Sequence, residues 1–234
     1  MDHRLRAAIC AVAAALAAAC SSSAPPQAAA QSNQHAFART PPAHTGRPRV
    51  VILGDSLTAG LGLAPDEAYP ALLQERLKKD GLDYDVINAG VSGDTSAGGL
   101  SRLDWALDGD VRVLVVALGG NDALRGLSVE QLKQNLSEIV RRAQARGIRV
   151  VLAGMEAPPN YGREYIVSFH KVYPTLAREY HVAFVPFLLQ GVAGVTSLNQ
   201  PDGIHPTAAG ARIVAENVRV VLEPILRNAP TDVQ

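Results

Sequence analysis

The sequence predicts an α/β fold in which helices cover both faces of one five-stranded parallel sheet. Short, largely continuous apolar runs recur along the chain. Runs of this kind are typical of strands that are buried on both faces, as in parallel sheets. Between the runs lie segments whose apolar residues recur every three or four positions, the spacing of an amphipathic helix. This alternation predicts a three-layer α/β/α sandwich.

The expected strands are five short runs rich in β-branched residues. Residues 49–53, Arg-Val-Val-Ile-Leu, form the first run, and Gly54 follows it directly. A short buried run that ends at glycine is typical of a strand that enters a turn. Comparable runs predict the other strands at residues 84–88, 111–118, 148–155 and 182–185.

The expected helices lie between these strands and after the last one. Their apolar spacing places them at residues 66–79, 97–107, 128–146, 164–180 and 207–226. Five parallel strands fit the flavodoxin-like order 2-1-3-4-5, in which the winding reverses between strands one and three. Ligands bind at such a reversal, outside the carboxyl ends of the strands. We therefore expect the chemistry in the loops that follow strands one and three.

Length, composition and charge restrict the class of protein. The chain has 234 residues, 47% of them hydrophobic, which suits one well-packed domain rather than two. Lysine and arginine together number 22, as do aspartate and glutamate, and no run of five like charges occurs. Because nucleic acids attract proteins that carry basic patches, a nucleic-acid partner is not expected.

The first 20 residues have the pattern of an export signal. Arg4 and Arg6 precede an apolar stretch that is shorter than the roughly 20 residues needed to span a membrane. Residues 16–20, Leu-Ala-Ala-Ala-Cys, resemble a lipoprotein cleavage box. Cleavage there would leave Cys20 as a lipidated N-terminus, which is the alternative we favour. Ordinary cleavage near residues 28–30 is the other alternative.

The mature chain is expected to begin with a disordered tether. Residues 21–47 are mainly serine, alanine, glutamine and proline, a composition that cannot bury enough apolar surface to fold. The folded domain is expected at residues 48–228, with a flexible tail at 229–234. An exported chain of this kind is expected in the periplasm, attached to the outer membrane if Cys20 is lipidated.

Two loops at the expected reversal carry residues that can do chemistry. Residues 54–57, Gly-Asp-Ser-Leu, place Ser56 on the turn after the first strand. Residues 119–122, Gly-Gly-Asn-Asp, follow the third strand and offer the side-chain amide of Asn121 as a hydrogen-bond donor. Each loop alone also has an ordinary interpretation, because serine often caps helices and glycine with asparagine often forms turns.

A serine hydroxyl needs a base before it becomes a good nucleophile. Three of the six histidines fall in the export signal or tether, and two lie in or beside an expected helix. The sixth, His205, follows Asp202 by three positions in the loop Asp-Gly-Ile-His-Pro. At this spacing the carboxylate can hold one ring nitrogen and leave the other for a hydroxyl. An Asx-turn before a helix would use the same residues.

Together these loops supply a nucleophile, Ser56, a base, His205, and an orienting acid, Asp202. The loop after the second strand adds Gly93, whose backbone amide would form an oxyanion hole with Asn121. Patterns for other chemistry are missing, namely the Walker loop, the dinucleotide fingerprint, zinc-ligand spacing and the Gly-x-Ser-x-Gly elbow. We therefore expect no cofactor and no metal.

At these residues the chain resembles the GDSL or SGNH hydrolases, whose four sequence blocks match here around Ser56, Gly93, Asn121 and His205. The resemblance covers about residues 49–227 and is strongest to the bacterial periplasmic thioesterase, lysophospholipase and arylesterase branch. It implies an SGNH hydrolase fold and a catalytic triad of Ser56, Asp202 and His205. It also implies an oxyanion hole formed by the amides of Ser56 and Gly93 and the side chain of Asn121.

The resemblance further implies a serine esterase acting on aryl esters, acyl thioesters or lysophospholipids. Residues 155–163 are similar to a mobile lip over an acyl groove, and residues 187–199 would form the opposite wall. A plain connection is the alternative for both segments. The candidate substrate-binding residues are Asp55, Leu57, Pro159, Tyr161 and Ile204.

Two rival functions stay open. One is a carbohydrate acetylesterase on the same scaffold. The other is a non-catalytic lipoprotein that binds lipids or glycans, against which the serine, histidine and aspartate argue because a binder needs no base. The expected partners are an acyl ester substrate and, through a lipidated Cys20, the membrane. We expect a monomer.

Overall fold

The computed structural model describes residues 46–228. The chain divides into two units, Met1–Pro42 and Ala43–Gln234, and the first lies outside the described residues. The expected export signal with Cys20, the tether up to residue 45 and the tail at 229–234 also lie outside them and stay predictions. Within residues 46–228, no helix has both the length and the apolar character that a membrane span requires.

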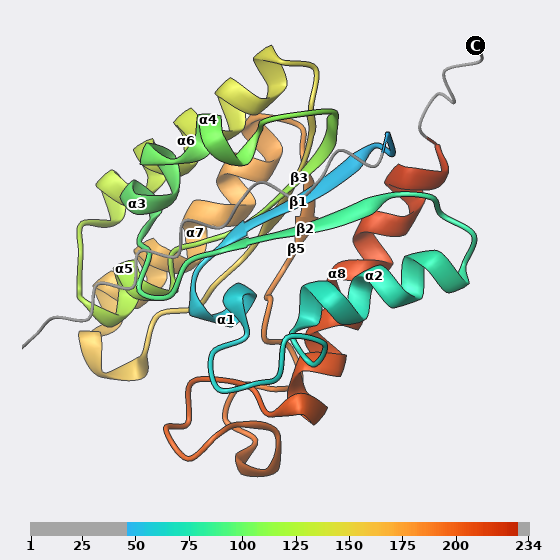
Figure 1. Ribbon diagram of the computed structural model, residues 1–234. Coiled ribbons are helices and arrows are strands. Elements are labelled where there is room, and N and C mark those ends of the chain that lie inside the picture. The colour runs from blue at the N-terminus through green and yellow to red at the C-terminus, as the bar shows by residue number, and fades with distance from the viewer. Residues whose placement is uncertain (1–45, 229–234) are drawn as a thin grey trace, which may run out of the picture. The chain divides into compact units, whose positions relative to one another are not determined.

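Five parallel strands form one sheet in the order β2-β1-β3-β4-β5, as the sequence predicts. The two central strands, β1 and β3, are covered on both sides, which explains their continuous apolar sequence. The sheet crosses the middle of Figure 1. The strands are β1 Arg49–Gly54, β2 Asp85–Gly90, β3 Val111–Ala117, β4 Arg149–Ala153 and β5 Ala183–Val185.

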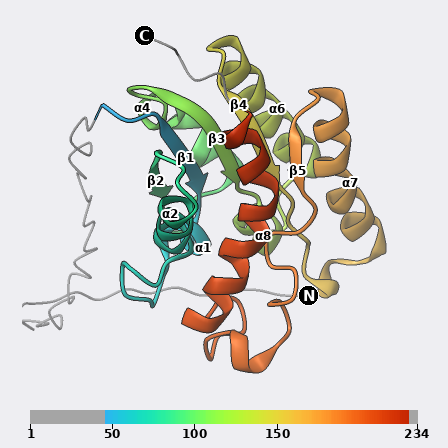
Figure 2. The same ribbon diagram turned by 90° about the vertical axis from the view of Figure 1, so that its right-hand side faces the viewer.

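Helices cover both faces of the sheet (Figures 1 and 2). Helices α2 and α8 pack together on one face, and α3, α6 and α7 lie on the other, so the predicted sandwich is confirmed. Two single 3₁₀ turns, η1 Pro159–Tyr161 and η2 Thr196–Leu198, lie in loops. The helices are α1 Ser56–Ala59, α2 Tyr69–Lys79, α3 Ser96–Ser101, α4 Leu103–Ala106, α5 Gly120–Leu124, α6 Val129–Ala145, α7 Arg163–Glu179 and α8 Ala208–Arg227.

Several helices differ from the sequence-based expectation. Helices α1 and α5 are single turns, which are too short to show an apolar period. The single helix expected at residues 97–107 is two short helices, α3 and α4, which meet at Arg102, whose backbone is not helical. Helix α2 begins at Tyr69 rather than at residue 66, and Pro70 occupies its first turn, where a missing N–H costs no helical hydrogen bond.

The carboxyl ends of three strands meet at one level. Gly54 at the end of β1 pairs with Gly90 of β2 and with Ala117 of β3. The loops that follow these strands therefore begin side by side. Gly54 also has to lack a side chain, because a Cβ atom there would lie 2.0 Å from Oγ1 of Thr58 on α1. Helix α1 consequently packs directly against the end of the sheet.

Candidate active site

Ser56 is the first residue of α1 and follows β1 after one intervening residue. That residue, Asp55, caps the helix, because its Oδ1 accepts a hydrogen bond from the backbone N–H of Leu57 at 3.0 Å. The interpretation of the serine as a helix cap is therefore wrong. Its hydroxyl has a different partner.

The partner is His205. Its Nε2 lies 2.9 Å from Oγ of Ser56, and its Nδ1 lies 2.6 Å from Oδ2 of Asp202. An ionised carboxylate can only accept hydrogen bonds, so Nδ1 carries the ring proton and donates it to Asp202. In the neutral ring, Nε2 is then the nitrogen that accepts the hydroxyl proton of Ser56. The structure thus joins these three sequence-predicted residues in one hydrogen-bonded chain.

Asp202 uses its two oxygens for different tasks. While Oδ2 holds the imidazole, Oδ1 accepts from the backbone N–H groups of His205 at 3.0 Å and Ile204 at 2.9 Å. The backbone hydrogen bond from His205, followed by its side-chain bond, lowers the pKa of Asp202 to about 2. The same carboxylate thus closes the Asx-turn with Oδ1 and contacts the imidazole with Oδ2. The carboxylate remains ionised near neutral pH.

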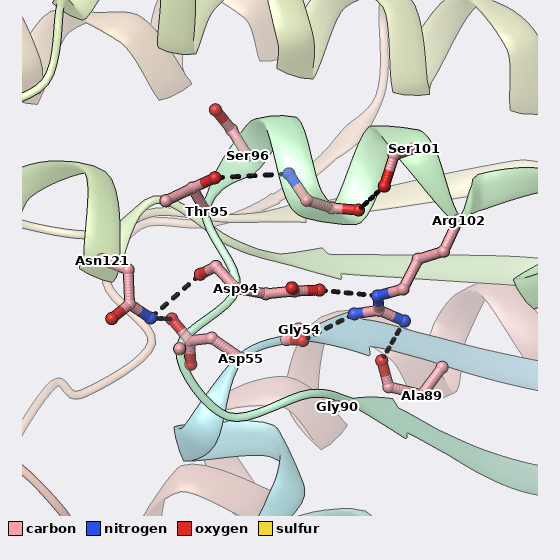
Figure 3. Close-up of polar contacts among 12 residues, drawn as sticks. Gly54, Asp55, Ala89, Gly90, Asp94, Thr95, Ser96, Ser101, Arg102 and Asn121 are labelled. Atoms are coloured by element: carbon pink, nitrogen blue, oxygen red, sulfur yellow. Dashed lines mark hydrogen bonds and ion pairs between the residues drawn. The ribbon is translucent and has the colours of Figure 1, made fainter. Parts of the chain in front are cut away.

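The predicted oxyanion donors lie on two neighbouring loops. Nδ2 of Asn121, on α5, donates to the backbone carbonyl of Asp94 at 2.9 Å and faces Oδ2 of Asp55 at 3.4 Å (Figure 3). Gly93 directly precedes Asp94, and its carbonyl accepts from the guanidinium of Arg125 at 2.8 Å. The structure brings Asn121 to the site, whereas amide donation by Gly93 stays a prediction.

Asp55 is the most buried acid of the site, with 2% of its surface exposed. Burial raises the pKa of Asp55 to about 6, against the opposing effect of its hydrogen bond from Leu57. Oδ2 of this carboxyl group lies 3.4 Å from the amide nitrogen of Asn121, one of the predicted oxyanion donors. Within the described part of the chain, no cluster of three or more His, Cys, Asp or Glu residues is placed to hold a metal ion.

A cavity of about 370 Å³ opens beside Ser56. Both segments expected to flank an acyl groove contribute to it, residues 155–159 on one side and Phe187, Leu189, Ala193 and Asn199 on the other. The surface of the cavity as a whole is largely apolar. Four of the five candidate substrate-binding residues line it, namely Asp55, Leu57, Pro159 and Ile204.

The fifth candidate, Tyr161, is not part of the cavity wall. Its hydroxyl donates to the backbone carbonyl of Leu124 at 2.5 Å, and its ring packs against Tyr165 with centroids 5.3 Å apart. Tyr161 thus supports the end of α5 from outside. Leu124 itself lines the cavity and was not expected, because a leucine in a short helix gives no signal that separates a cavity wall from the core.

The sequence matches a known family over most of the domain. Residues 52–213 match the model of the GDSL-like lipase/acylhydrolase family. The chain belongs to this family. The resemblance inferred from the sequence is thereby confirmed.

Relatives of this GDSL-like hydrolase match about three quarters of the chain. Esterase TesA of Pseudomonas aeruginosa is 48% identical over 178 residues, which are 76% of this chain and 89% of the relative. Thioesterase 1/protease 1/lysophospholipase L1 of Escherichia coli K12 is 37% identical over 180 residues, 76% of this chain and 85% of the relative. A crystal structure of TesA matches the fold with a TM-score of 0.73 and 47% identity, covering 76% of this chain and 99% of that one. The GDSL-like chain is accordingly a serine hydrolase that acts on ester bonds.

Proposed function

We propose that this GDSL-like hydrolase cleaves carboxylic esters and thioesters of acyl chains through an acyl-enzyme on Ser56. The observation that carries the proposal is the hydrogen-bonded chain from Asp202 through His205 to Ser56, with distances of 2.6 and 2.9 Å. A hydroxyl becomes an effective nucleophile when an adjacent base takes its proton. His205 is within reach to do so, and Asp202 holds the ring in the required tautomer.

The reaction has two halves. In the first, Nε2 of His205 takes the proton of Ser56 while Oγ attacks the carbonyl carbon of the substrate. The imidazolium, stabilised by the carboxylate of Asp202, then gives this proton to the leaving alcohol or thiol as the tetrahedral intermediate collapses. In the second half, His205 takes a proton from water, the hydroxide attacks the acyl-serine ester, and the proton returns to Ser56 as the acid leaves.

The oxyanion of each tetrahedral intermediate needs hydrogen-bond donors. We assign this role to the backbone amides of Ser56 and Gly93 and to the side chain of Asn121. One N–H of Asn121 is engaged by the carbonyl of Asp94 at 2.9 Å. Its contact with Asp55 is 3.4 Å, which is long for a hydrogen bond, so the second N–H is available to an oxyanion.

The substrate class follows from the walls of the cavity beside Ser56. Leu124, Met155, Phe187 and Leu189 offer apolar surface that favours an acyl chain over a sugar. The relative from Escherichia coli is named for both thioesterase and lysophospholipase activity. Fatty acyl thioesters, lysophospholipids and aryl esters are therefore the proposed substrates, and a carbohydrate acetate is the disfavoured one.

A substrate comparison tests this proposal. The enzyme is assayed with p-nitrophenyl esters and acyl thioesters of increasing chain length, and with an acetylated sugar. Ser56→Ala should abolish hydrolysis of all of them, whereas Ser168→Ala, which changes an exposed serine on α7, should leave it unchanged. Faster deacetylation of the sugar would favour the carbohydrate esterase. Hydrolysis that survives in Ser56→Ala would contradict the mechanism.

We also propose that the chain is exported and held at the outer membrane by a lipid on Cys20, and that it acts as a monomer. The support for export and anchoring is the sequence of residues 1–47 alone. The mass of the mature N-terminus checks the anchor: a diacylated or triacylated Cys20 agrees with it, and a terminus near residue 30 does not. Light scattering of the purified domain checks the monomer.

A further inference from the structure

Arg102 connects three segments at the carboxyl end of the sheet (Figure 3). Its Nη2 donates to the carbonyl of Gly54 at 2.9 Å, and its Nη1 donates to the carbonyl of Ala89 at 2.8 Å. Its Nε forms an ion pair with Oδ2 of Asp94 at 2.6 Å. The side chains of Arg102 and Asp94 are each 17% exposed, so this pair is largely withdrawn from water and its hydrogen bonds are strong.

The two carbonyls belong to the strands that carry the site. Gly54 ends β1 two positions before Ser56, and Ala89 lies near the end of β2, before the loop that contains Gly93. A planar guanidinium presents several N–H groups in a fixed fork and can hold both carbonyls and a carboxylate at once. A lysine ammonium at the same place lacks this fork.

Asp94 extends the connection to the other loop. Its backbone carbonyl accepts the hydrogen bond from Nδ2 of Asn121 at 2.9 Å, and it directly follows Gly93. Helix α3 packs closely on its carboxylate, because a Cβ atom on Gly98 would lie 2.6 Å from Oδ1 of Asp94. Asp94, whose side chain is held by Arg102, therefore contacts one predicted oxyanion donor, Asn121, and is the chain neighbour of the other, Gly93.

We propose that Arg102 and Asp94 are positioning residues that fix the oxyanion donors Gly93 and Asn121 relative to Ser56. This inference rests on the function proposed above. Neither residue belongs to the hydrogen-bonded chain of Ser56, His205 and Asp202, so both act indirectly, by holding the strand ends and the loop that carry Ser56 and the donors. Donors stabilise charge that develops in the transition state, and a displacement of about 1 Å in a catalytic geometry costs on the order of a hundredfold in rate.

The expected result is a selective loss of kcat. Asp94→Asn keeps the size and the backbone carbonyl of the residue but removes the ion pair, and Arg102→Lys keeps the charge but removes the fork. Each should lower kcat by about tenfold or more while KM stays within about twofold, because the substrate itself is still bound. The acid side of the kcat/KM profile should keep its midpoint, since the base is untouched.

A matched control is the exposed carboxylate of Asp104 on α4, which forms ion pairs with Arg142 on α6 and, at 2.7 Å, with Arg146 just beyond the end of that helix. Asp104→Asn should leave kcat and KM unchanged. If Arg102→Lys fails to fold, Asp94→Asn still decides the question. Folded Asp94→Asn and Arg102→Lys proteins with kcat within twofold of the wild type would overturn the proposal.

A double-mutant cycle separates positioning from general damage. Asn121→Ala removes one donor and should cost about a hundredfold or more in kcat. In that background Asp94→Asn should cost clearly less than it does alone, because part of what it positions is already gone. Fully additive losses would contradict the positioning role. Activity retained in Ser56→Ala would instead refute the proposed function, so the two failures are distinguishable.

Discussion

Nε2 of His205 lies 2.9 Å from Oγ of Ser56, although 149 positions separate the two residues in the chain. The contact exists because the loop after β5 returns to the end of β1, where α1 presents the serine. Gln200 helps to fix the returning loop, since its backbone N–H donates to the carbonyl of His205 at 2.7 Å and its side chain donates to the carbonyl of Leu61 at 2.7 Å.

Asp202→Asn should lower kcat by about 10⁴-fold without unfolding the domain. The new amide would donate to Nδ1 of His205, so the ring proton would move to Nε2 and the base would be lost. The measurement is steady-state hydrolysis of a p-nitrophenyl ester, with circular dichroism as the check on folding. A folded variant with more than a tenth of the wild-type kcat would show that Asp202 does not set the tautomer.

Activity should rise with pH on the acid side, because only the neutral ring of His205 accepts a proton. Asp202 does not contribute to this rise, since hydrogen bonds from His205 hold its pKa at about 2. Asp55 is the other group to consider, because burial raises its pKa to about 6. In Asp55→Asn the acid limb of kcat/KM should persist. If the acid-side rise of kcat/KM disappeared in Asp55→Asn, the rise would belong to Asp55 instead of His205.

Asp55→Asn should also change how stability depends on pH. The folded pKa of about 6 exceeds the ordinary aspartate value of 3.8, so the native state binds the proton more tightly. The stabilising contribution of protonated Asp55 is complete below the unfolded value and is lost as the pH rises through about 6. Relative to wild type, the variant should therefore gain up to about 3 kcal/mol of unfolding free energy between roughly pH 4 and pH 8. Urea unfolding at both pH values measures the gain, and a pH-independent difference would argue against it.

Ala157→Phe should shorten the preferred acyl chain. Ala157 is half-buried and lines the cavity beside Ser56, so a larger side chain there removes space for the chain. We expect kcat/KM for long-chain esters to fall at least about tenfold more than for the acetyl ester. The reason is that a difference of one methylene group in an apolar pocket already changes kcat/KM by about tenfold or more. Val220→Phe, at an exposed position of α8, is the control. An equal loss for all chain lengths would mean that the cavity does not hold the acyl group.

The sheet order was predictable because it depends on features that a sequence displays directly. Apolar runs such as residues 49–53 and 111–118 show strands, and parallel strands linked by helices have few allowed arrangements. The same reasoning placed Ser56 and Asn121 at one edge of the sheet. The structure agrees, since Gly54 at the end of β1 pairs with Ala117 at the end of β3. His205 was identified by its spacing in the sequence, three positions after Asp202 in a loop, rather than by any periodic pattern.

Other features depend on packing that a sequence does not display. Asp55, rather than Ser56, caps α1, and the choice follows from which side chain reaches the N–H of Leu57. Arg102 falls inside an apparent helical period, yet its side chain donates to two strand carbonyls and the helix is interrupted at this residue. The displacement of Tyr161 from the cavity likewise depends on a hydrogen bond to a backbone carbonyl. Such contacts join residues far apart in sequence and leave no local pattern.

The identity of the nucleophile can be measured directly by reaction with a fluorophosphonate followed by mass spectrometry of the digested protein. One covalent adduct is expected on the peptide that contains Ser56, with no adduct in Ser56→Ala and normal labelling in Ser168→Ala. Prior acidification should slow the reaction, because a protonated His205 cannot take the hydroxyl proton. An adduct on another residue, or labelling that persists in Ser56→Ala, would show that the contact between Ser56 and His205 does not make this serine the nucleophile.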